Sequence, residues 1–207
     1  MCGFTRESDV RAACELGADM VGVIVGFPGS PRDLPLERAE EVLSAVGEGV
    51  EKVVVTPAEL ATEVCARLRP DYLQPHGCSP EWLQRVRGAI GVKLIGVVPV
   101  PRVATDAGEV VERALAMGEV ADLLLLDTEG GGGAGLTHDW SISRRIVEVA
   151  PRRVFLAGGL NPRNVGEAIR VVRPQGVDVC SGVESKPGRK DPELMKAFID
   201  AVRGVRD

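Results

Sequence analysis

The 207-residue chain is poor in aromatic side chains, which make up 3% of it. Its core must therefore be built from aliphatic residues, as is common where parallel strands are covered by helices. No apolar run reaches membrane-spanning length and no signal peptide is recognisable, so we expect a cytoplasmic protein with no membrane partner. The net charge is -5, and no basic cluster predicts binding to nucleic acid.

Cysteines are few and irregularly spaced. There are five of them, with no CxxC pair: Cys2, Cys14, Cys65, Cys78 and Cys180. An odd count without regular spacing argues against a disulfide framework. We interpret Cys14 and Cys65 as small core residues. A metal site made of Cys2, His76, Cys78 and Cys180 is an alternative, but the irregular spacing disfavours it, and we expect no metal.

Strand-like and helix-like segments alternate along the whole chain. The expected strands are Met20–Val25, Glu51–Val55, Tyr72–Gln74, Lys93–Val98, the Leu123 run, Val154–Ala157 and Val177–Val179. Eight helical segments separate and flank them, the first at Ser8–Leu16 and the last at Pro192–Val202. This alternation predicts a single α/β domain over residues 1–207, either a (β/α)8 barrel or an open doubly wound sheet.

A (β/α)8 barrel needs one more strand than the pattern contains. That strand has to precede Ser8, and only Met1–Gly3 could supply it. We therefore expect the first strand to be truncated or missing, with the neighbouring edges partly unpaired and the natural start upstream. On this interpretation, a form extended at its amino terminus is more stable and more active than the 207-residue form.

One stretch combines a buried strand with a carboxylate and a glycine-rich loop. Leu123–Leu126 is uniformly apolar and predicts a strand buried on both faces. Asp127 follows it, and then come Gly130–Gly133 and Gly135. Burial at a strand end would raise the pKa of Asp127 and make it a proton donor near neutral pH. The alternative is a structural carboxylate that caps a turn or pairs with an arginine.

Two later strand ends carry glycines. Ala157–Val165 reads AGGLNPRNV and Cys180–Ser185 reads CSGVES. In a barrel these would be the seventh and eighth βα loops, whose exposed amides can bind an anion. Together they predict a phosphate site and hence a small phosphorylated substrate. Its residues would be Gly158, Gly159, Ser181 and Gly182.

Motifs along nearly the whole chain resemble those of the phosphoribosylanthranilate isomerase family. They are CGFTRESDV at 2–10, SPR at 30–32, QPHG at 74–77, LLLLDT at 123–128, HDW at 138–140, FLAGGLNPRNVGEAI at 155–169, GVDVCSGVES at 176–185 and PGRKDPELMKAFI at 187–199. The resemblance implies a (β/α)8 barrel. It also implies a cofactor-free Amadori rearrangement in tryptophan biosynthesis.

The resemblance also implies roles for individual residues. Cys2 would be the general base, Asp127 the general acid, and Arg32 the partner of the anthranilate carboxylate. A thiol acts as a base only as its thiolate, so the pKa of Cys2 would have to fall. His76 would line the site, and Asp178 would contact substrate or hold the barrel interior. Outside these roles, we interpret His138 as a turn residue and Asp139 as a helix cap.

The chain departs from the family pattern at Met1, Asp33, Pro75 and Cys180. The short amino terminus affects how firmly the base Cys2 is held, and the departures at Asp33, Pro75 and Cys180 affect substrate selectivity. The sequence therefore leaves two alternative functions: an active isomerase, or a catalytically weak phosphate-binding barrel. We expect a monomer or a homodimer.

Overall fold

The computed structural model describes residues 1–103, 107–130 and 135–205. In this part of the chain, seven parallel strands pair in the order of the sequence to form one curled sheet. The strands are β1 (Met20–Ile24), β2 (Glu51–Pro57), β3 (Tyr72–His76), β4 (Lys93–Val100), β5 (Leu123–Thr128), β6 (Arg153–Leu156) and β7 (Gly176–Val177).

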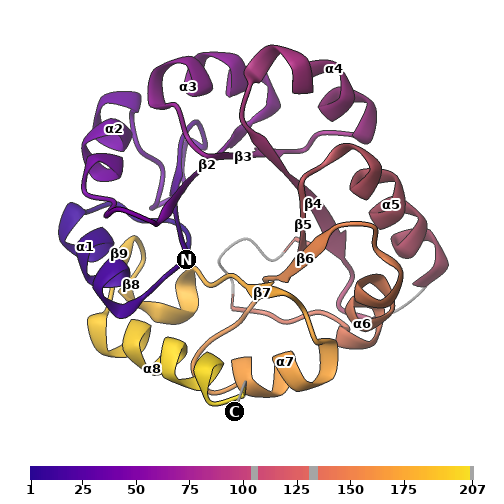
Figure 1. Cartoon of the computed structure of the whole chain (residues 1–207). Helices are drawn as coiled ribbons and strands as arrows, with labels where there is room; N and C mark the ends of the chain where they lie inside the picture. The colour runs from indigo at the N-terminus through magenta and orange to yellow at the C-terminus, as the bar shows by residue number, and fades with distance from the viewer. Residues whose placement is uncertain (104–106, 131–134, 206–207) are drawn as a thin grey trace.

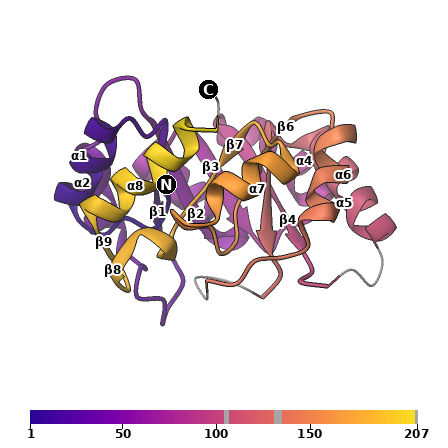
Figure 2. The same cartoon turned by 90° about the horizontal axis from the view of Figure 1, so that it is seen from below.

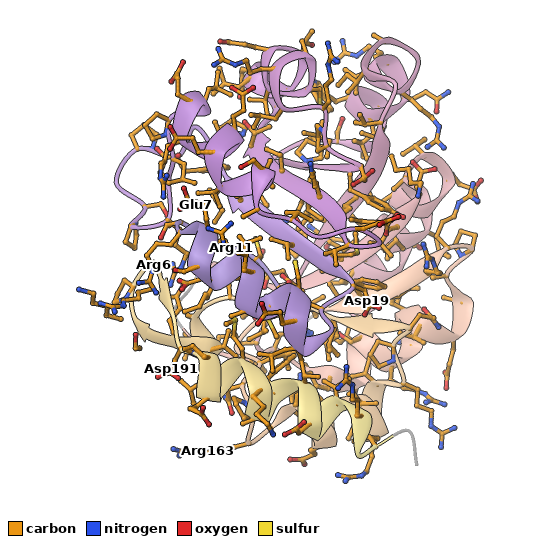
Figure 3. The ribbon with its side chains drawn as sticks, turned by 60° about the vertical axis from the view of Figure 1, so that its left-hand side comes forward. Arg6, Glu7, Arg11, Asp19, Arg163 and Asp191 are labelled. Carbon is orange, nitrogen blue, oxygen red and sulfur yellow. The ribbon has the colours of Figure 1, made fainter. Side chains whose placement is uncertain are left out.

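Helices surround the outer face of the curled sheet (Figure 1). They are α1 (Glu7–Leu16), α2 (Leu36–Ser44), α3 (Ala61–Leu68), α4 (Pro80–Ile90), α5 (Ala107–Val120), α6 (Trp140–Val149), α7 (Val165–Val172) and α8 (Pro192–Arg203). None of those helices is both long enough and apolar enough to cross a membrane. Carboxylates start two of them: Asp139 caps α6, and Asp191, labelled in Figure 3, caps α8. The expected cap at Asp139 is confirmed.

The leucine run of β5 is buried on both faces, as expected. Leu124 and Leu126 pack in the large core between the sheet and the helices. Leu123 and Leu125 instead join a smaller cluster that also contains Tyr72 and Ile95. This alternation follows from the two-residue period of a strand, which sends successive side chains to opposite faces.

Residues 1–4 form no assigned strand, yet they are hydrogen-bonded on both sides. Gly22 N donates to Met1 O at 2.9 Å and Phe4 N to Gly22 O at 3.0 Å. On the other side, Cys2 N donates to Val179 O at 3.0 Å. The expectation that this short segment leaves its neighbours unpaired is therefore wrong for these groups. The four residues connect β1 to the segment after β7.

Two features differ from the sequence prediction. A small antiparallel hairpin, β8 (Glu184–Lys186) with β9 (Arg189–Lys190), follows the short 3-10 helix η2 (Ser181–Val183) and was not predicted. The Asn161-Pro162 pair predicts a helix over Pro162–Val172, but helix α7 begins at Val165. The reason is a turn in which Asn161 Oδ1 accepts from Arg163 N at 2.9 Å. Asx turns of this kind compete with the first turn of a helix.

Candidate active site

The loop after β1 and the β8–β9 hairpin project from one side of the molecule, the lower side in Figure 2. In parallel α/β sheets this carboxyl-end side is where functional residues collect. Asp127 and His76 lie at the carboxyl ends of β5 and β3, and Gly158 follows β6 after one intervening residue. Gly131–Gly133 of the predicted glycine loop lie outside the described residues.

Asp127 lies in a largely desolvated position, and burial raises the pKa of its carboxyl group. Thr128 N donates to its Oδ1 at 2.8 Å, which opposes that rise, whereas the charge of Asp178 reinforces it. A raised pKa favours the protonated form, which is the form a general acid requires. This direction agrees with the role expected for Asp127.

The loop behind Asp127 is held by a buried histidine. Thr128 Oγ1 donates to Leu136 O at 2.9 Å and contacts His138 Nδ1 at 3.1 Å. Because the Thr128 hydroxyl donates its proton to Leu136 O, the imidazole proton of His138 must be on Nδ1, which donates to Thr128 Oγ1. Nε2 of His138 then accepts a hydrogen bond from Ser143 Oγ at 2.7 Å. The interpretation of His138 as a turn residue missed this role, because burial (5% exposed) is a tertiary property.

We expect His138 to make the protein sensitive to acid. Burial lowers its pKa from 6.5 to about 4, so the neutral ring stabilises the fold above pH 6.5 and that stabilisation is lost as pH falls towards 4. Between neutral pH and about pH 5 the loss should be about 2 kcal/mol, by linkage between these two pKa values. Urea unfolding at both pH values should show this loss in the parent and a smaller one in His138→Gln. The matched control is His76→Gln, because His76 is exposed; an equal loss in both variants would contradict the assignment.

The two glycine loops lie against each other. Gly158 and Gly159 have left-handed backbones, with φ of 82° and 65°. A Cβ on Gly158 would overlap Thr128 and lie 3.0 Å from Asp127 Oδ1. A Cβ on Gly182 would overlap Leu160 O. The predicted phosphate-binding residues are therefore neighbours, and they border the carboxylate of Asp127.

Cys2 is half-buried, and a Cβ on Gly22 would lie 3.2 Å from its Sγ. Burial raises its pKa well above the ordinary value, and the charges of Asp178 and Cys180 act in the same direction. Lys190 and the terminal ammonium oppose the rise. This direction is opposite to the lowered pKa that the role of a thiolate base requires. Gly3 turns the chain at φ 73°, and a Cβ there would come within 2.8 Å of both Arg32 Cδ and Cys180 Sγ.

Arg32 is 8% exposed and is already paired. Its Nε and Nη2 donate to Glu184 at 2.8 and 2.7 Å. Lys190 Nζ donates to the same carboxylate at 2.9 Å. The sequence interpretation assigned no role to Glu184 or Lys190. The only signal for them was their place in the CSGVES and GRKDP motifs.

The two remaining predicted residues lie at the border of the site. His76 is exposed and meets Phe27 edge to face, with ring centroids 5.6 Å apart. Its charge would lower the pKa of Asp127. Asp178 N donates to Leu156 O at 2.8 Å, and its carboxylate lies 3.5 Å from the ammonium of Met1. Asp178 influences both Cys2 and Asp127, so its carboxylate is electrostatically close to both proposed catalytic groups.

A cavity of about 700 Å³ reaches Cys2 and Asp178 from the opposite end of the sheet. Its lining includes Asp19, Glu51 and Arg153, which lie at or just before the starts of strands. Asp127 and the glycine loops do not line it. We therefore place the site by the chemistry at the carboxyl ends rather than by this cavity. Among the described residues, no group of three or more His, Cys, Asp or Glu side chains is arranged to hold a metal ion.

Comparison with known proteins gives concordant matches. A family profile described as N-(5'phosphoribosyl)anthranilate (PRA) isomerase matches residues 1–201. A curated N-(5'-phosphoribosyl)anthranilate isomerase from Methanocella arvoryzae is 40% identical over 211 residues, covering 98% of this chain and 96% of that protein. The crystal structure of phosphoribosyl anthranilate isomerase from Thermotoga maritima is 34% identical with a TM-score of 0.84, covering 99% and 97%. A third match, 33% identical with a TM-score of 0.81 and covering 98% and 96%, is a phosphoribosyl anthranilate isomerase in complex with reduced 1-(o-carboxyphenylamino)-1-deoxyribulose 5-phosphate.

Proposed function

This chain belongs to the N-(5'-phosphoribosyl)anthranilate isomerase family, and we propose that Cys2 and Asp127 carry out its reaction. The enzyme is an isomerase of tryptophan biosynthesis that acts on N-(5'-phosphoribosyl)anthranilate. The product, 1-(o-carboxyphenylamino)-1-deoxyribulose 5-phosphate, differs only in the positions of hydrogen atoms and bonds. Proton transfer by side chains is therefore sufficient, and we propose that no cofactor takes part.

The first step opens the ribosyl ring. The anilino nitrogen donates its electron pair to C1′, the bond from C1′ to the ring oxygen breaks, and Asp127 gives its proton to that oxygen. The observation that carries this assignment is the desolvated carboxyl of Asp127, which borders the Gly158 loop. A protonated acid beside the phosphate-binding loops is well placed for a sugar phosphate.

The second step moves the hydrogen from C2′. The Cys2 thiolate removes the C2′ proton, and the bonding electrons form a double bond between C1′ and C2′ while the iminium nitrogen becomes neutral. The resulting enol then gives up its hydroxyl proton and takes a proton at C1′, which yields the aminoketose. One base and one acid on separate elements satisfy both steps.

Arg32 is proposed to bind the anthranilate carboxylate. Its pair with Glu184 uses the edge of the guanidinium between Nε and Nη2. A substrate carboxylate would take the other edge, between Nη1 and Nη2, in a second forked contact. His76 and Asp178 are proposed to line the substrate-binding region.

The phosphate is proposed to lie between Gly158–Gly159 and Ser181–Gly182. Substituting a glycine does not test this placement cleanly, because a Cβ on Gly159 would overlap the backbone of Leu136. Ser181→Ala is the better change. Loss of a hydrogen bond to a charged group should raise KM by roughly tenfold and leave kcat within a factor of about two. Steady-state kinetics checks this, with Ser185→Ala, in the exposed hairpin, as control; equal falls in kcat and kcat/KM would contradict it.

The architecture is proposed to be a (β/α)8 barrel in one domain, with residues 1–4 in the place of the first strand. Their hydrogen bonds to Gly22 and Val179 support this closure. We propose that the enzyme acts in the cytoplasm as a monomer or a homodimer.

The activity is tested by following the loss of phosphoribosylanthranilate fluorescence on adding the purified chain. An active isomerase consumes the substrate catalytically, at rates proportional to enzyme concentration. A barrel that only binds phosphate would protect the substrate or leave it unchanged, and that result would overturn the proposal.

A further inference from the structure

Lys190 is a buried cation with fixed partners. It is 1% exposed, and its Nζ lies 2.9 Å from Glu184 Oε1 and 2.9 Å from Cys180 O. The same ammonium is 3.8 Å from Cys180 Sγ and 5.4 Å from the ring centroid of Phe4. Its own backbone N donates to Asp9 Oδ2 at 3.1 Å. The ammonium therefore has one well-defined position.

The charges around this lysine do not balance. Arg32 and Lys190 contribute two positive charges and Glu184 one negative charge, because hydrogen bonds from Arg32 and the charge of Lys190 hold the pKa of Glu184 below its usual value despite burial. Asp178 is paired with the terminal ammonium and Asp9 with Arg6, so one positive charge is left over in a desolvated region. An unpaired buried charge is unfavourable, so the cluster favours one more anion nearby.

When no substrate carboxylate is bound to Arg32, two thiols are the neighbouring groups that can supply that anion. Cys180 is next to Lys190 Nζ, and Gly3, the neighbour of Cys2, lies against both Cys180 Sγ and Arg32. We propose that Lys190 is a positioning residue of the reaction, whose buried ammonium favours the thiolate form of Cys2 against the effect of burial. This inference rests on the proposed role of Cys2 as the base.

Several groups act on the same thiol. Lys190 and the terminal ammonium lower the pKa of Cys2, whereas burial, Asp178 and Cys180 raise it. Lys190 also acts on Cys180, where it lowers the pKa against the effect of burial. The test must therefore separate the two thiols.

The experiment uses the full chain with Cys180→Ser, which leaves one thiol beside the cluster. In this background, ultraviolet absorbance of the thiolate is titrated against pH, and the matching Cys2→Ala protein is subtracted to isolate Cys2. Lys190→Met should move the Cys2 titration to higher pH by about one unit, and Lys190→Arg should restore most of the shift. At neutral pH, kcat/KM of Lys190→Met should be about tenfold lower, and the alkaline limb of its pH profile should lie about one unit higher than in the parent.

A charge-balanced variant separates electrostatics from packing. Lys190→Met with Glu184→Gln leaves Arg32 as the one unpaired cation, so Cys2 should titrate close to its position in the Cys180→Ser background. If the Lys190→Met protein fails to fold, this double variant still tests the proposal. Lys196→Met is the remote control, since Lys196 is exposed and pairs with Asp200; it should change neither quantity.

The outcomes are distinguishable. If Lys190→Met is slow but Cys2 titrates as before, Lys190 is only structural and this proposal fails. If Cys2→Ala keeps full activity, Cys2 is not the base and the proposed function fails at that residue, whatever Lys190 does.

Discussion

Replacing Asp127 with asparagine should lower kcat by about 10²–10⁴-fold, the contribution that general acid catalysis usually makes. The amide has nearly the same size and can still accept the hydrogen bond from Thr128 N. It has no carboxyl proton to give to the ring oxygen. Steady-state kinetics should therefore show a large fall in kcat with a nearly unchanged KM.

The control for this change is at the other end of the same strand. Asp122 accepts a hydrogen bond from Leu94 N and pairs with Arg87, far from the glycine loops along β5. Asp122→Asn should keep full activity. An Asp127→Asn enzyme with most of the parental turnover would show that another group donates the proton.

Removing the thiol of Cys2 should have an effect at least as large. Cys2→Ala deletes the proposed base for the C2′ proton, so kcat should fall by about 10²–10⁴-fold or more. Cys2→Ser should be equally slow, because a hydroxyl ionises far less readily than a thiol. Cys14→Ser, on the half-buried face of α1, is the control and should remain active. Comparable losses in Cys2→Ala and Cys14→Ser would contradict the assignment.

The directions of the two pKa shifts define the active protonation state. Burial places the pKa of Cys2 well above 9.0, whereas the pKa of Asp127 is raised from only 3.8. The proposed mechanism needs Cys2 as a thiolate and Asp127 protonated, which is the reverse of the dominant state between the two values. A plot of kcat/KM against pH should therefore be bell-shaped, with Asp127 on the acid limb and Cys2 on the alkaline limb. Lys190 opposes the rise at Cys2 and so increases the share of this minor form.

Local patterns in the sequence predicted much of the fold. The alternation of strands and helices follows from hydrophobic period and from capping residues such as Asp139 and Asp191. The burial of Leu123–Leu126 on both faces follows from a continuous apolar run. These features depend on neighbours in the chain, which the sequence shows directly.

The parts that were missed depend on contacts between distant segments. The pair of Arg32 with Glu184 joins residues 152 positions apart, and the bond from Lys190 N to Asp9 joins residues 181 apart. The hydrogen bonds of residues 1–4 to Gly22 and Val179 likewise depend on the closed arrangement of the sheet. The pKa of Cys2 was expected to fall and instead rises, because desolvation in the assembled structure outweighs the nearby cations.

The most direct test of this account is a crystal structure of the chain with reduced 1-(o-carboxyphenylamino)-1-deoxyribulose 5-phosphate bound. We expect the phosphate on the Gly158–Gly159 and Ser181–Gly182 amides. Cys2 Sγ should lie about 3.5 Å from C2′, and the Asp127 carboxyl about 3 Å from the oxygen that closes the ring, on the other side of the sugar. A complex in which Cys2 does not face C2′, or in which Asp127 contacts neither the ring-closing oxygen nor its neighbours, would contradict the proposed mechanism.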